Sequence, residues 1–331
     1  MPWSPPPVRN VLAFRAELGQ QGSAGIMTMK APINSTTDRT LPLNMRALRL
    51  WFAVESRISP RTAENRAARI FATPPRQPKR SQAKLRAQTL ASAAESTTTI
   101  VVRDKAEEVV ATSIGDGPTV MFLHGWGGCA MDMSALANAF ATAGYRSILF
   151  DMPGHGRTAG RESSLVEFLK TIRSVTGALG PPDLIVGHSF GGAAAVFAIT
   201  ELGLPLRGAV LVSPAPGPAY YVNRFARAVG LPHARTEGMI RQLVRRVGRS
   251  LESLDAVVAA RDATVPALVF HDPADREVPF EFATRMSEAW RQSRLVPTPS
   301  LGHKRILRDP GTIAAAIEFA DSLIGVSFRA Q

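Results

Sequence analysis

The sequence of 331 residues has one cysteine, Cys129, and it lacks a run of about 18 apolar residues of the kind that spans a membrane. A single thiol excludes a disulfide within the chain, which fits a reducing compartment and favours a cytoplasmic location. The secretory pattern of charged start, apolar core and small cleavage site is also missing. No group of histidines and cysteines has the spacing of metal ligands, so we expect no metal and no other cofactor.

Acidic side chains are scarce near the start of the chain. Residues 1–100 hold 15 lysines and arginines but 5 aspartates and glutamates, whereas residues 101–331 hold 24 and 22. The net charge of +12 therefore belongs mainly to the first hundred positions. No nucleic-acid motif with interleaved aromatic residues accompanies it, so we expect no nucleic-acid partner. Contact of the basic N-terminus with a membrane surface is the less favoured alternative.

The N-terminal region divides into two parts by composition. Residues 1–45 have turn formers and no sustained periodicity, which predicts a disordered basic segment. Residues 46–97 form a helical, Pro- and Arg-rich extension. Partial helical periodicity between residues 47 and 72, broken near Ser59-Pro60, predicts two short helices. We interpret this extension as a tether that docks on the surface of the following domain.

From residue 98 onward, strands and helices alternate. Apolar segments predict strands near residues 98–103, 107–113, 119–123, 147–151, 184–188, 208–213, 266–271 and 294–299. Periodic segments predict helices near residues 131–143, 164–178, 191–202, 280–292 and 310–324. The alternation indicates an α/β fold with a mostly parallel eight-stranded sheet, helices on both faces and an antiparallel first hairpin. The core would comprise residues 98–214 and 265–326.

One short stretch narrows the chemistry more than any other. Residues 182–192 read Pro-Asp-Leu-Ile-Val-Gly-His-Ser-Phe-Gly-Gly. This is a Gly-x-Ser-x-Gly elbow, in which a strand turns sharply into a helix with Ser189 at the apex, and Gly187 and Gly191 leave room for the turn. Because an alcohol is a poor nucleophile near neutral pH, Ser189 needs a histidine base, and that histidine needs a carboxylate.

The base must follow both the nucleophile and the acid in the order that this type of sheet imposes. His303, after the last predicted strand, satisfies that order, so we expect it to be the base. The other histidines lie at the ends of earlier predicted strands or in a helical insertion: His124, His155, His188, His271 and His233.

The acid lies in the loop after residues 266–271. Asp272 and Asp275 share this loop, and Glu277 is close in sequence. Asp275 is favoured because it lies further from the strand and nearer the expected turn apex, whereas Asp272, in an Asp-Pro pair, suits a turn residue that bonds its own backbone. Whether Asp272 shares the acid role stays open at this point.

A glycine-rich loop supplies the expected oxyanion hole. Residues 119–123 form an apolar strand that ends in His124-Gly125-Trp126-Gly127-Gly128. Glycines at Gly125 and Gly127 let backbone N–H groups face a developing negative oxygen. We expect the amides of Trp126 and Phe190 to be the donors, with His124 supporting the loop.

These segments together resemble the α/β-hydrolase superfamily. The matching segments occur in the family's order: His124–Gly128, Asp151–Gly156, Gly187–Gly191, His271–Pro279 and Gly302-His303. The resemblance covers about residues 98–326 and implies an α/β-hydrolase fold with Ser189 as nucleophile, Asp275 as acid and His303 as base. It departs from the family at Asp272, where glycine is more usual. Members with aspartate at the elbow are epoxide hydrolases or dehalogenases, and Ser189 argues against both.

Residues 215–264 interrupt the alternation and predict a small helical cap of about three short helices over the catalytic edge. The cap carries Arg224, Arg227, Arg241, Arg245, Arg246 and Arg249. We favour a solvated helix face for these arginines. The alternative is recognition of an anionic end of the substrate.

The sequence therefore predicts a serine hydrolase that cleaves an ester-like acyl bond of a small-molecule substrate through an acyl-enzyme. A thioesterase, lactonase, acyltransferase or carbon–carbon bond hydrolase would use the same three residues. The alternatives outside this chemistry are a ligand-binding or interaction module without activity and a peripheral protein held by its basic tail. The sequence leaves the oligomeric state open.

Overall fold

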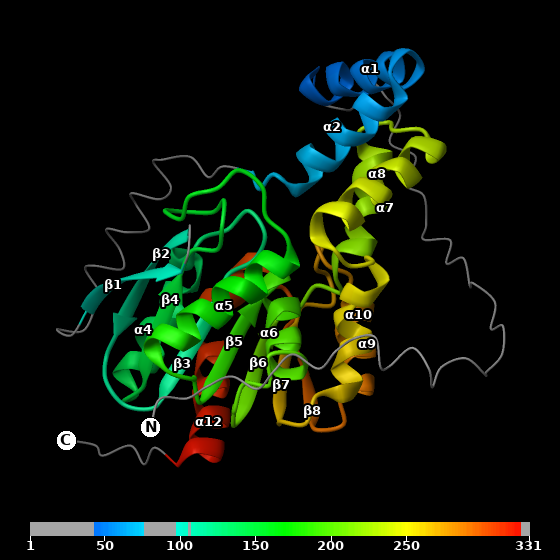
Figure 1. Cartoon of the computed structure of the whole chain (residues 1–331). Helices are drawn as coiled ribbons and strands as arrows, with labels where there is room; N and C mark the ends of the chain where they lie inside the picture. The colour runs from blue at the N-terminus through cyan, green and yellow to red at the C-terminus, as the bar shows by residue number, and fades with distance from the viewer. Residues whose placement is uncertain (1–42, 76–96, 105–106, 326–331) are drawn as a thin grey trace, which may run out of the picture.

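The computed structural model describes residues 43–75, 97–104 and 107–325, and most of the predicted disordered segment 1–45 lies outside this part. Its centre is a sheet of eight strands in the order β1-β2-β4-β3-β5-β6-β7-β8 (Figure 1). The strands are β1 Thr97–Asp104, β2 Glu107–Ile114, β3 Thr119–Leu123, β4 Arg146–Phe150, β5 Leu184–His188, β6 Gly208–Val212, β7 Ala267–His271 and β8 Ser293–Pro297. β2 pairs antiparallel with β1 and β4, and all later pairings are parallel. The predicted α/β-hydrolase fold is confirmed.

The central strands are apolar on both faces because helices cover both. In β5, β6 and β7 every residue is buried. Alternate residues point to opposite sides, so Ile185 packs in one core cluster and Val186 in the other. The first cluster lies under α5 Leu165–Leu179, α6 Phe190–Thr200 and α10 Phe280–Ala289. The second lies under α4 Ser134–Thr142 and α12 Pro310–Ile324.

A third core cluster lies outside the sheet, in a four-helix unit. It joins α1 Leu43–Ile58 and α2 Pro60–Ala72 to α7 Pro218–Ala228 and α8 His233–Val247, which lie together at one end of the molecule (Figure 1). Phe52, Ala67, Ala68 and Met239 are fully buried in this cluster. The two N-terminal helices meet at Ser59, where the periodicity had predicted a break, and they extend the cap.

The cap helices occupy less of the chain than the expected range 215–264. Short helical turns follow α8 at Glu252–Leu254, at Ala256–Ala259 (α9) and at Ala260–Asp262. Their buried side chains, Leu254, Ala256 and Ala260 among them, join the first core cluster under the sheet. The reason is that α9 packs against α6 and α10. Residues 254–260 are therefore part of the hydrolase core.

A buried ion pair fastens α2 to the cap. The carboxylate of Glu64 accepts a hydrogen bond from Arg235 Nη1 at 2.8 Å, and Glu64 is 6% exposed. It packs on Gly238 of α8, where an added Cβ would lie 1.9 Å from the Glu64 carboxyl carbon. Because Gly238 has no side chain, the Glu64 carboxylate can pack directly against the backbone of α8. Removal of one partner of such a pair leaves an uncompensated buried charge, so this contact ties the N-terminal helices to α8.

No helix among the described residues is long and apolar enough to cross a membrane.

Candidate active site

Ser189 lies at the turn from β5 into α6 and has a backbone that non-glycine residues rarely adopt. Its φ is 52° and its ψ is −118°, a conformation that costs about 1–3 kcal/mol. The turn is tight enough that a Cβ on Gly187 would lie 2.5 Å from the carbonyl oxygen of Gly191. A Cβ on Gly191 would lie 2.3 Å from the carbonyl oxygen of Leu123. Both glycines are therefore sterically required, and they hold Ser189 at the sheet edge.

His303 and Asp275 form a hydrogen-bonded pair at the same edge. His303 Nδ1 donates to Asp275 Oδ2 at 2.7 Å, and the carboxylate side chain is fully buried. The amides of Glu277 and Val278 donate to Asp275 Oδ1 at 2.8 and 3.1 Å. Burial alone would raise the pKa of Asp275, but the hydrogen bonds from His303 and Val278 outweigh it and lower that pKa to about 2. The carboxylate therefore stays ionised and fixes the imidazole with its Nε2 free for a second partner.

Asp272 has a different set of contacts from Asp275. Its carboxylate accepts hydrogen bonds from the amides of Ala274, at 2.7 Å, and of Gly302. These backbone donors outweigh the effect of burial and lower the pKa of Asp272. Asp272 thus ties the acid loop to the residue that precedes His303, while Asp275 contacts the imidazole itself. The turn-residue interpretation of Asp272 agrees with these contacts.

The remaining histidines support the loops around the site. His188 Nε2 donates to the carbonyl oxygen of His303 at 2.9 Å, and His271 Nε2 donates to that of Val278 at 2.9 Å. His124 Nδ1 donates to the Gly125 carbonyl at 2.8 Å, while its Nε2 accepts from the Met152 amide at 3.0 Å. Each of these imidazoles bonds backbone atoms and is buried. His233, by contrast, lies on the exposed start of α8, where its side chain is 92% exposed.

Buried neutral histidines make the fold sensitive to acid. Burial lowers the pKa of His188 to about 3 and that of His155 to about 4, from an ordinary 6.5. Below pH 6.5 the unfolded chain binds protons that these native imidazoles refuse, so the free energy of unfolding falls as pH falls toward 4. We expect each of these two histidines to lower the free energy of unfolding by about 2 kcal/mol at about pH 5, relative to its value above pH 6.5. Urea unfolding at about pH 7 and at about pH 5 measures this difference.

Two variants separate this effect from general acid sensitivity. His188→Gln should flatten the dependence of the unfolding free energy on pH, because it removes one buried titrating group. His233→Gln controls for the substitution itself, because its side chain is 92% exposed and its loss removes no buried imidazole. Equal unfolding free energies for the unsubstituted chain at both pH values would contradict the prediction.

The loop after β3 makes a tight turn around Trp126. Gly127 has a φ of +70°, and the Gly128 amide donates to the Gly125 carbonyl at 3.0 Å, which closes a turn around Trp126. The rings of Trp126 and Phe190 pack edge to face at a centroid distance of 5.4 Å. Among the described residues, the amides of Trp126 and Phe190 donate to no backbone carbonyl.

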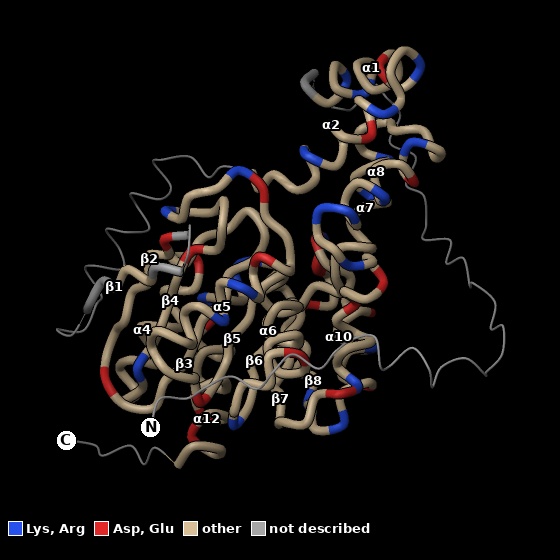
Figure 2. Tube along the Cα trace, viewed as in Figure 1, with Lys and Arg blue, Asp and Glu red and all other residues tan. Residues whose placement is uncertain are grey.

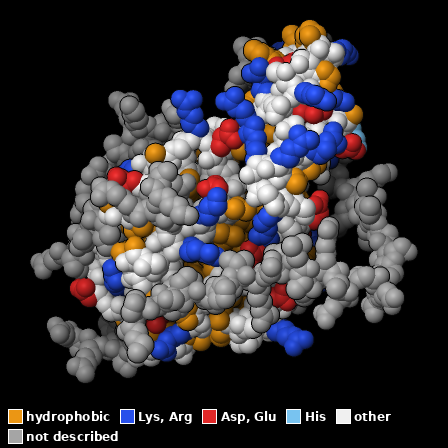
Figure 3. Space-filling view, in the orientation of Figure 1, with side chains coloured by type: hydrophobic (Ala, Val, Ile, Leu, Met, Phe, Trp, Pro, Cys, Tyr) orange, Lys and Arg blue, Asp and Glu red, His pale blue; other side chains and the backbone are white. Residues whose placement is uncertain are grey.

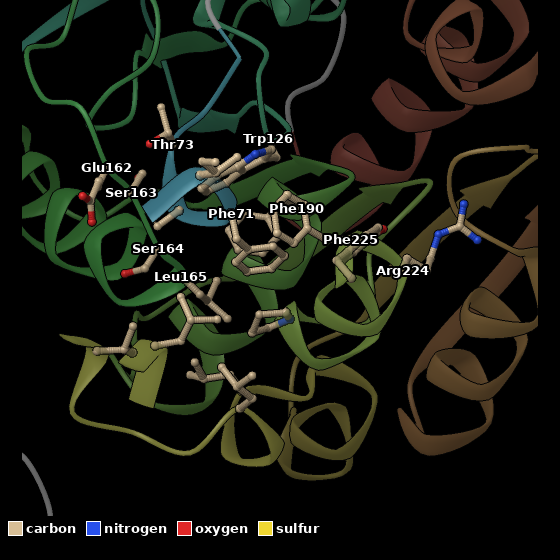
Figure 4. Close-up of a pocket in the computed structure, with 18 of the residues that line it drawn as sticks. Phe71, Thr73, Trp126, Glu162, Ser163, Ser164, Leu165, Phe190, Arg224 and Phe225 are labelled. Carbon is tan, nitrogen blue, oxygen red and sulfur yellow. The ribbon is translucent and has the colours of Figure 1, made fainter. Parts of the chain in front are cut away.

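A cavity of about 720 Å³ brings these residues together. Ser189, His303, Trp126 and Phe190 all line it, and Figure 4 draws both aromatic rings beside side chains from the cap. The Glu277 carboxylate lies 3.8 Å from His303 Nε2 at the same wall. A volume of this size accommodates a small-molecule ligand.

The N-terminal extension supplies one wall of this cavity, which the sequence did not indicate. Residues 70–73, at the end of α2, line it, and the Phe71 ring packs edge to face on Phe225 of α7 at 5.6 Å (Figure 4). The Ala72 carbonyl accepts a hydrogen bond from the Ser163 amide at 2.8 Å. Pro75 packs on Gly127, where an added Cβ would lie 2.6 Å from its Cγ. The extension therefore contacts the loop that carries Trp126.

Two of the six cap arginines line the cavity, Arg224 and Arg246. Arg246 Nη1 donates to Glu162 at 2.6 Å, and Arg69 of α2 lies 3.5 Å from the same carboxylate. Arg224 Nη1 donates to the Tyr220 hydroxyl at 3.1 Å. The Glu162 carboxylate thus faces two guanidiniums. The apolar side chains of Phe71, Phe225, Leu243, Val247 and Leu251 lie on the same wall.

Cys129, which follows the oxyanion loop, is 2% exposed and precedes a short helical turn. Burial, with the nearby Asp132 and Asp151, raises the pKa of its thiol to about 12. The thiol is thus protonated at neutral pH and is a poor nucleophile. This agrees with the interpretation of Cys129 as a small residue at a helix start.

Residues 120–316 match a model of the "Alpha/beta hydrolase family". Among curated relatives, the chain is 24% identical to the "Bifunctional esterase/perhydrolase DCH" of Acinetobacter calcoaceticus over 238 residues, 57% of this chain and 86% of the relative. It is 38% identical to an "Epoxide hydrolase" of Caballeronia sordidicola over 85 residues, 24% of this chain and 26% of that enzyme. The chain thus spans about a quarter of the latter relative's length.

Solved structures share the fold at low identity. The structure of Est1E from Butyrivibrio proteoclasticus with bound ferulic acid has a TM-score of 0.56 and 20% identity, and the match covers 68% of this chain and 99% of that one. A serine hydrolase involved in carbazole degradation, the CarC enzyme, has a TM-score of 0.54 and 20% identity over 69% of this chain and all of the other.

Proposed function

The chain belongs to the alpha/beta hydrolase family, and from this we propose that it is a serine hydrolase that cleaves an ester-like acyl bond through Ser189, His303 and Asp275. The observation that carries the proposal is the meeting of three features at one cavity. These are a strained elbow serine, an imidazole whose Nδ1 lies 2.7 Å from a buried carboxylate, and two lining residues, Trp126 and Phe190, whose amides donate to no backbone carbonyl among the described residues.

The proposed reaction proceeds through an acyl-enzyme. His303 Nε2 removes the proton of the Ser189 hydroxyl, which attacks the substrate carbonyl carbon. The amides of Trp126 and Phe190 donate to the resulting oxyanion, and loss of one such donor typically costs about 2.7–4 kcal/mol. His303 then protonates the leaving alcohol. Water activated by the same imidazole attacks the acyl carbon and releases the acid, and the proton returns to Ser189.

Asp275 holds His303 in the tautomer that leaves Nε2 unprotonated and stabilises the imidazolium that forms. The amides of Glu277 and Val278 donate to the Asp275 carboxylate and help to keep it ionised. The similarity to a bifunctional esterase/perhydrolase supports a reaction at an acyl carbon. The epoxide hydrolase match covers a quarter of that enzyme, and an alcohol at the elbow suits attack on a carbonyl.

We propose that the substrate carries an apolar acyl group of medium length. The cavity holds about 720 Å³, and its far wall is made of aromatic and aliphatic side chains from α2, α7 and α8. The Arg246 guanidinium is paired with Glu162 at 2.6 Å, a carboxylate that it shares with Arg69, and this pairing weakens its attraction for a substrate anion. Burial of apolar surface is therefore the main source of binding free energy at this wall.

Fluorophosphonate labelling followed by mass mapping tests this proposal. We expect one adduct, on Ser189, and a burst of p-nitrophenol from p-nitrophenyl esters when acylation outpaces deacylation. Parallel thioester, lactone and carbon–carbon bond substrates then distinguish the reactions that share this machinery. A native protein that neither labels at Ser189 nor turns over any member of the panel would instead be a binding module.

The end of α2 should influence acyl selectivity. Phe71→Ala removes a ring from the cavity wall, so the ratio of kcat/KM for octanoyl over acetyl esters should fall by about tenfold, because the longer acyl chain loses apolar contact and one methylene in an apolar pocket is worth about 1–3 kcal/mol. Because Phe71 contacts Phe225, the double variant with Phe225→Ala should change the ratio by less than the product of the single effects. An unchanged ratio in Phe71→Ala would contradict this role.

A further inference from the structure

One face of α1 is apolar and exposed to solvent. The described residues include seven large hydrophobic side chains that are exposed, and four of them lie on this helix. They are Leu50, Trp51, Val54 and Ile58, with exposed fractions of 68%, 55%, 47% and 78%. In Figure 3, hydrophobic side chains gather at the end of the molecule where α1 lies. We call these four residues the α1 face.

The spacing of the α1 face places it on one side of the helix. At about 100° per residue, positions 50, 51, 54 and 58 lie within an arc of about 100°. The opposite side packs on α2 and the cap, where Phe52 is fully buried and Met45 and Leu48 are partly buried. The contacts of Phe52, Met45 and Leu48 already hold α1 to the molecule. The apolar side chains of the α1 face therefore have another role.

Arginines dominate the exposed charged side chains around the α1 face. The exposed charged side chains of α1 and α2 are all arginines: Arg46, Arg57, Arg61, Arg66 and Arg69. The two glutamates of these helices are shielded, since Glu64 is buried against Arg235 and Glu55 is bound by Arg66 at 3.0 Å. The Arg66 guanidinium also lies 5.0 Å from the centre of the Trp51 ring. Figure 2 shows the basic positions along both helices.

We propose that the α1 face docks on a lipid bilayer that carries anionic headgroups. An amphipathic helix that lies in the interface buries an apolar strip at the acyl boundary, with cations among the phosphates. Tryptophan and arginine are the side chains that suit this depth, because each has an apolar body and a polar end. A symmetric dimer through the same face would instead bring identical arginine sets together.

Docking there would hold the bilayer on the helix that leads into the cavity-lining helix α2. The hairpin that carries the α1 face ends in residues 70–73, which line the site. If the proposed hydrolysis holds, the bilayer is then a source of acyl esters. The docking itself does not depend on that reaction, so Ser189→Ala should bind vesicles as the unsubstituted chain does.

Co-sedimentation of the full chain with vesicles tests the docking. We expect binding to vesicles of phosphatidylcholine mixed with phosphatidylglycerol, weaker binding to pure phosphatidylcholine, and weakening with salt. Val54→Glu should lower the partition coefficient at least about tenfold, because it places a carboxylate in the buried strip. Val258→Glu is the matched control, since Val258 is 49% exposed, as against 47% for Val54, and lies on α9. It should bind normally.

Three outcomes would overturn the docking proposal. The first is absence of binding to the anionic vesicles. The second is an equal loss in Val54→Glu and Val258→Glu, which would place the contact elsewhere in the chain, such as its other basic segments. The third is a dimer in sedimentation velocity that Val54→Glu dissociates while vesicle binding persists, which would make a second copy the occupant. Retained thermal unfolding temperatures verify that both variants are folded.

Discussion

Ser189→Ala should lower kcat for ester hydrolysis by about a million-fold and leave the thermal unfolding temperature nearly unchanged. The large factor follows because a single missing nucleophile disables the whole catalytic unit, and the residual rate comes from the oxyanion hole and substrate binding. The unfolding temperature should hold because the hydroxyl of Ser189 faces the cavity, while the backbone turn is set by Gly187 and Gly191. Steady-state kinetics on p-nitrophenyl esters measures the effect.

Ser213→Ala supplies the matched control. Ser213 is also a serine with positive φ, 47°, and it also follows a central strand, but it is fully buried. Its hydroxyl has no hydrogen-bond partner among the described residues, so its removal leaves no partner unsatisfied. We expect turnover within a few-fold of the unsubstituted chain. If Ser189→Ala retained turnover, hydrolysis would have to use another nucleophile and the proposed mechanism would be wrong.

The elbow and the sheet could be inferred from sequence because their constraints are local. At Gly187 the steric requirement acts against Gly191, four positions away, so the sequence carries it directly, whereas the requirement at Gly191 comes from Leu123 at the end of β3. The buried strands read as apolar runs because both faces are covered. Strand order then follows from chain connectivity, and a parallel sheet brings the carboxyl ends of its strands to one edge.

The choice between Asp272 and Asp275 required coordinates. Both aspartates lie in one loop, and their positions in the sequence favoured Asp275 without showing which carboxylate contacts His303. The structure separates them by partner, since one carboxylate bonds the His303 ring and the other bonds the Gly302 amide. Sequence alone cannot assign such contacts, because the loop's path across about thirty residues of intervening chain decides them.

The contribution of the N-terminal extension to the cavity was missed for a similar reason. Its helices were expected from periodicity, but their docking depends on pairs far apart in sequence, such as Glu64 with Arg235 and Ala72 with Ser163. No local pattern at the end of α2 marks Phe71 as a wall of the site. A deletion of residues 1–90 would therefore remove part of the cavity wall together with the basic N-terminal segment.

Asp275→Asn should lower kcat by about a thousand- to ten-thousand-fold with a smaller effect on KM. An asparagine amide can donate to His303 Nδ1, which favours the tautomer with the proton on Nε2, and that tautomer cannot accept a proton from Ser189. Asp272→Asn is the matched control, because Asp272 is 1% exposed and lies three positions before Asp275, whose side chain is also buried. Its carboxylate bonds the Gly302 amide, so we expect loss of stability, about 1–3 kcal/mol, and kcat within about tenfold.

Asp275→Asn and Asp272→Asn should have opposite effects on kcat and on the free energy of unfolding, so the two measurements together identify the catalytic acid. The acid that orients the imidazole should mainly affect kcat, whereas the one that joins two loops should mainly affect the unfolding free energy. A large kcat loss in Asp272→Asn, together with near-normal turnover in Asp275→Asn, would transfer the acid role to Asp272. Equal losses of kcat in both would mean that His303 depends on the loop as a whole, because displacement of Gly302 also moves the residue that follows it.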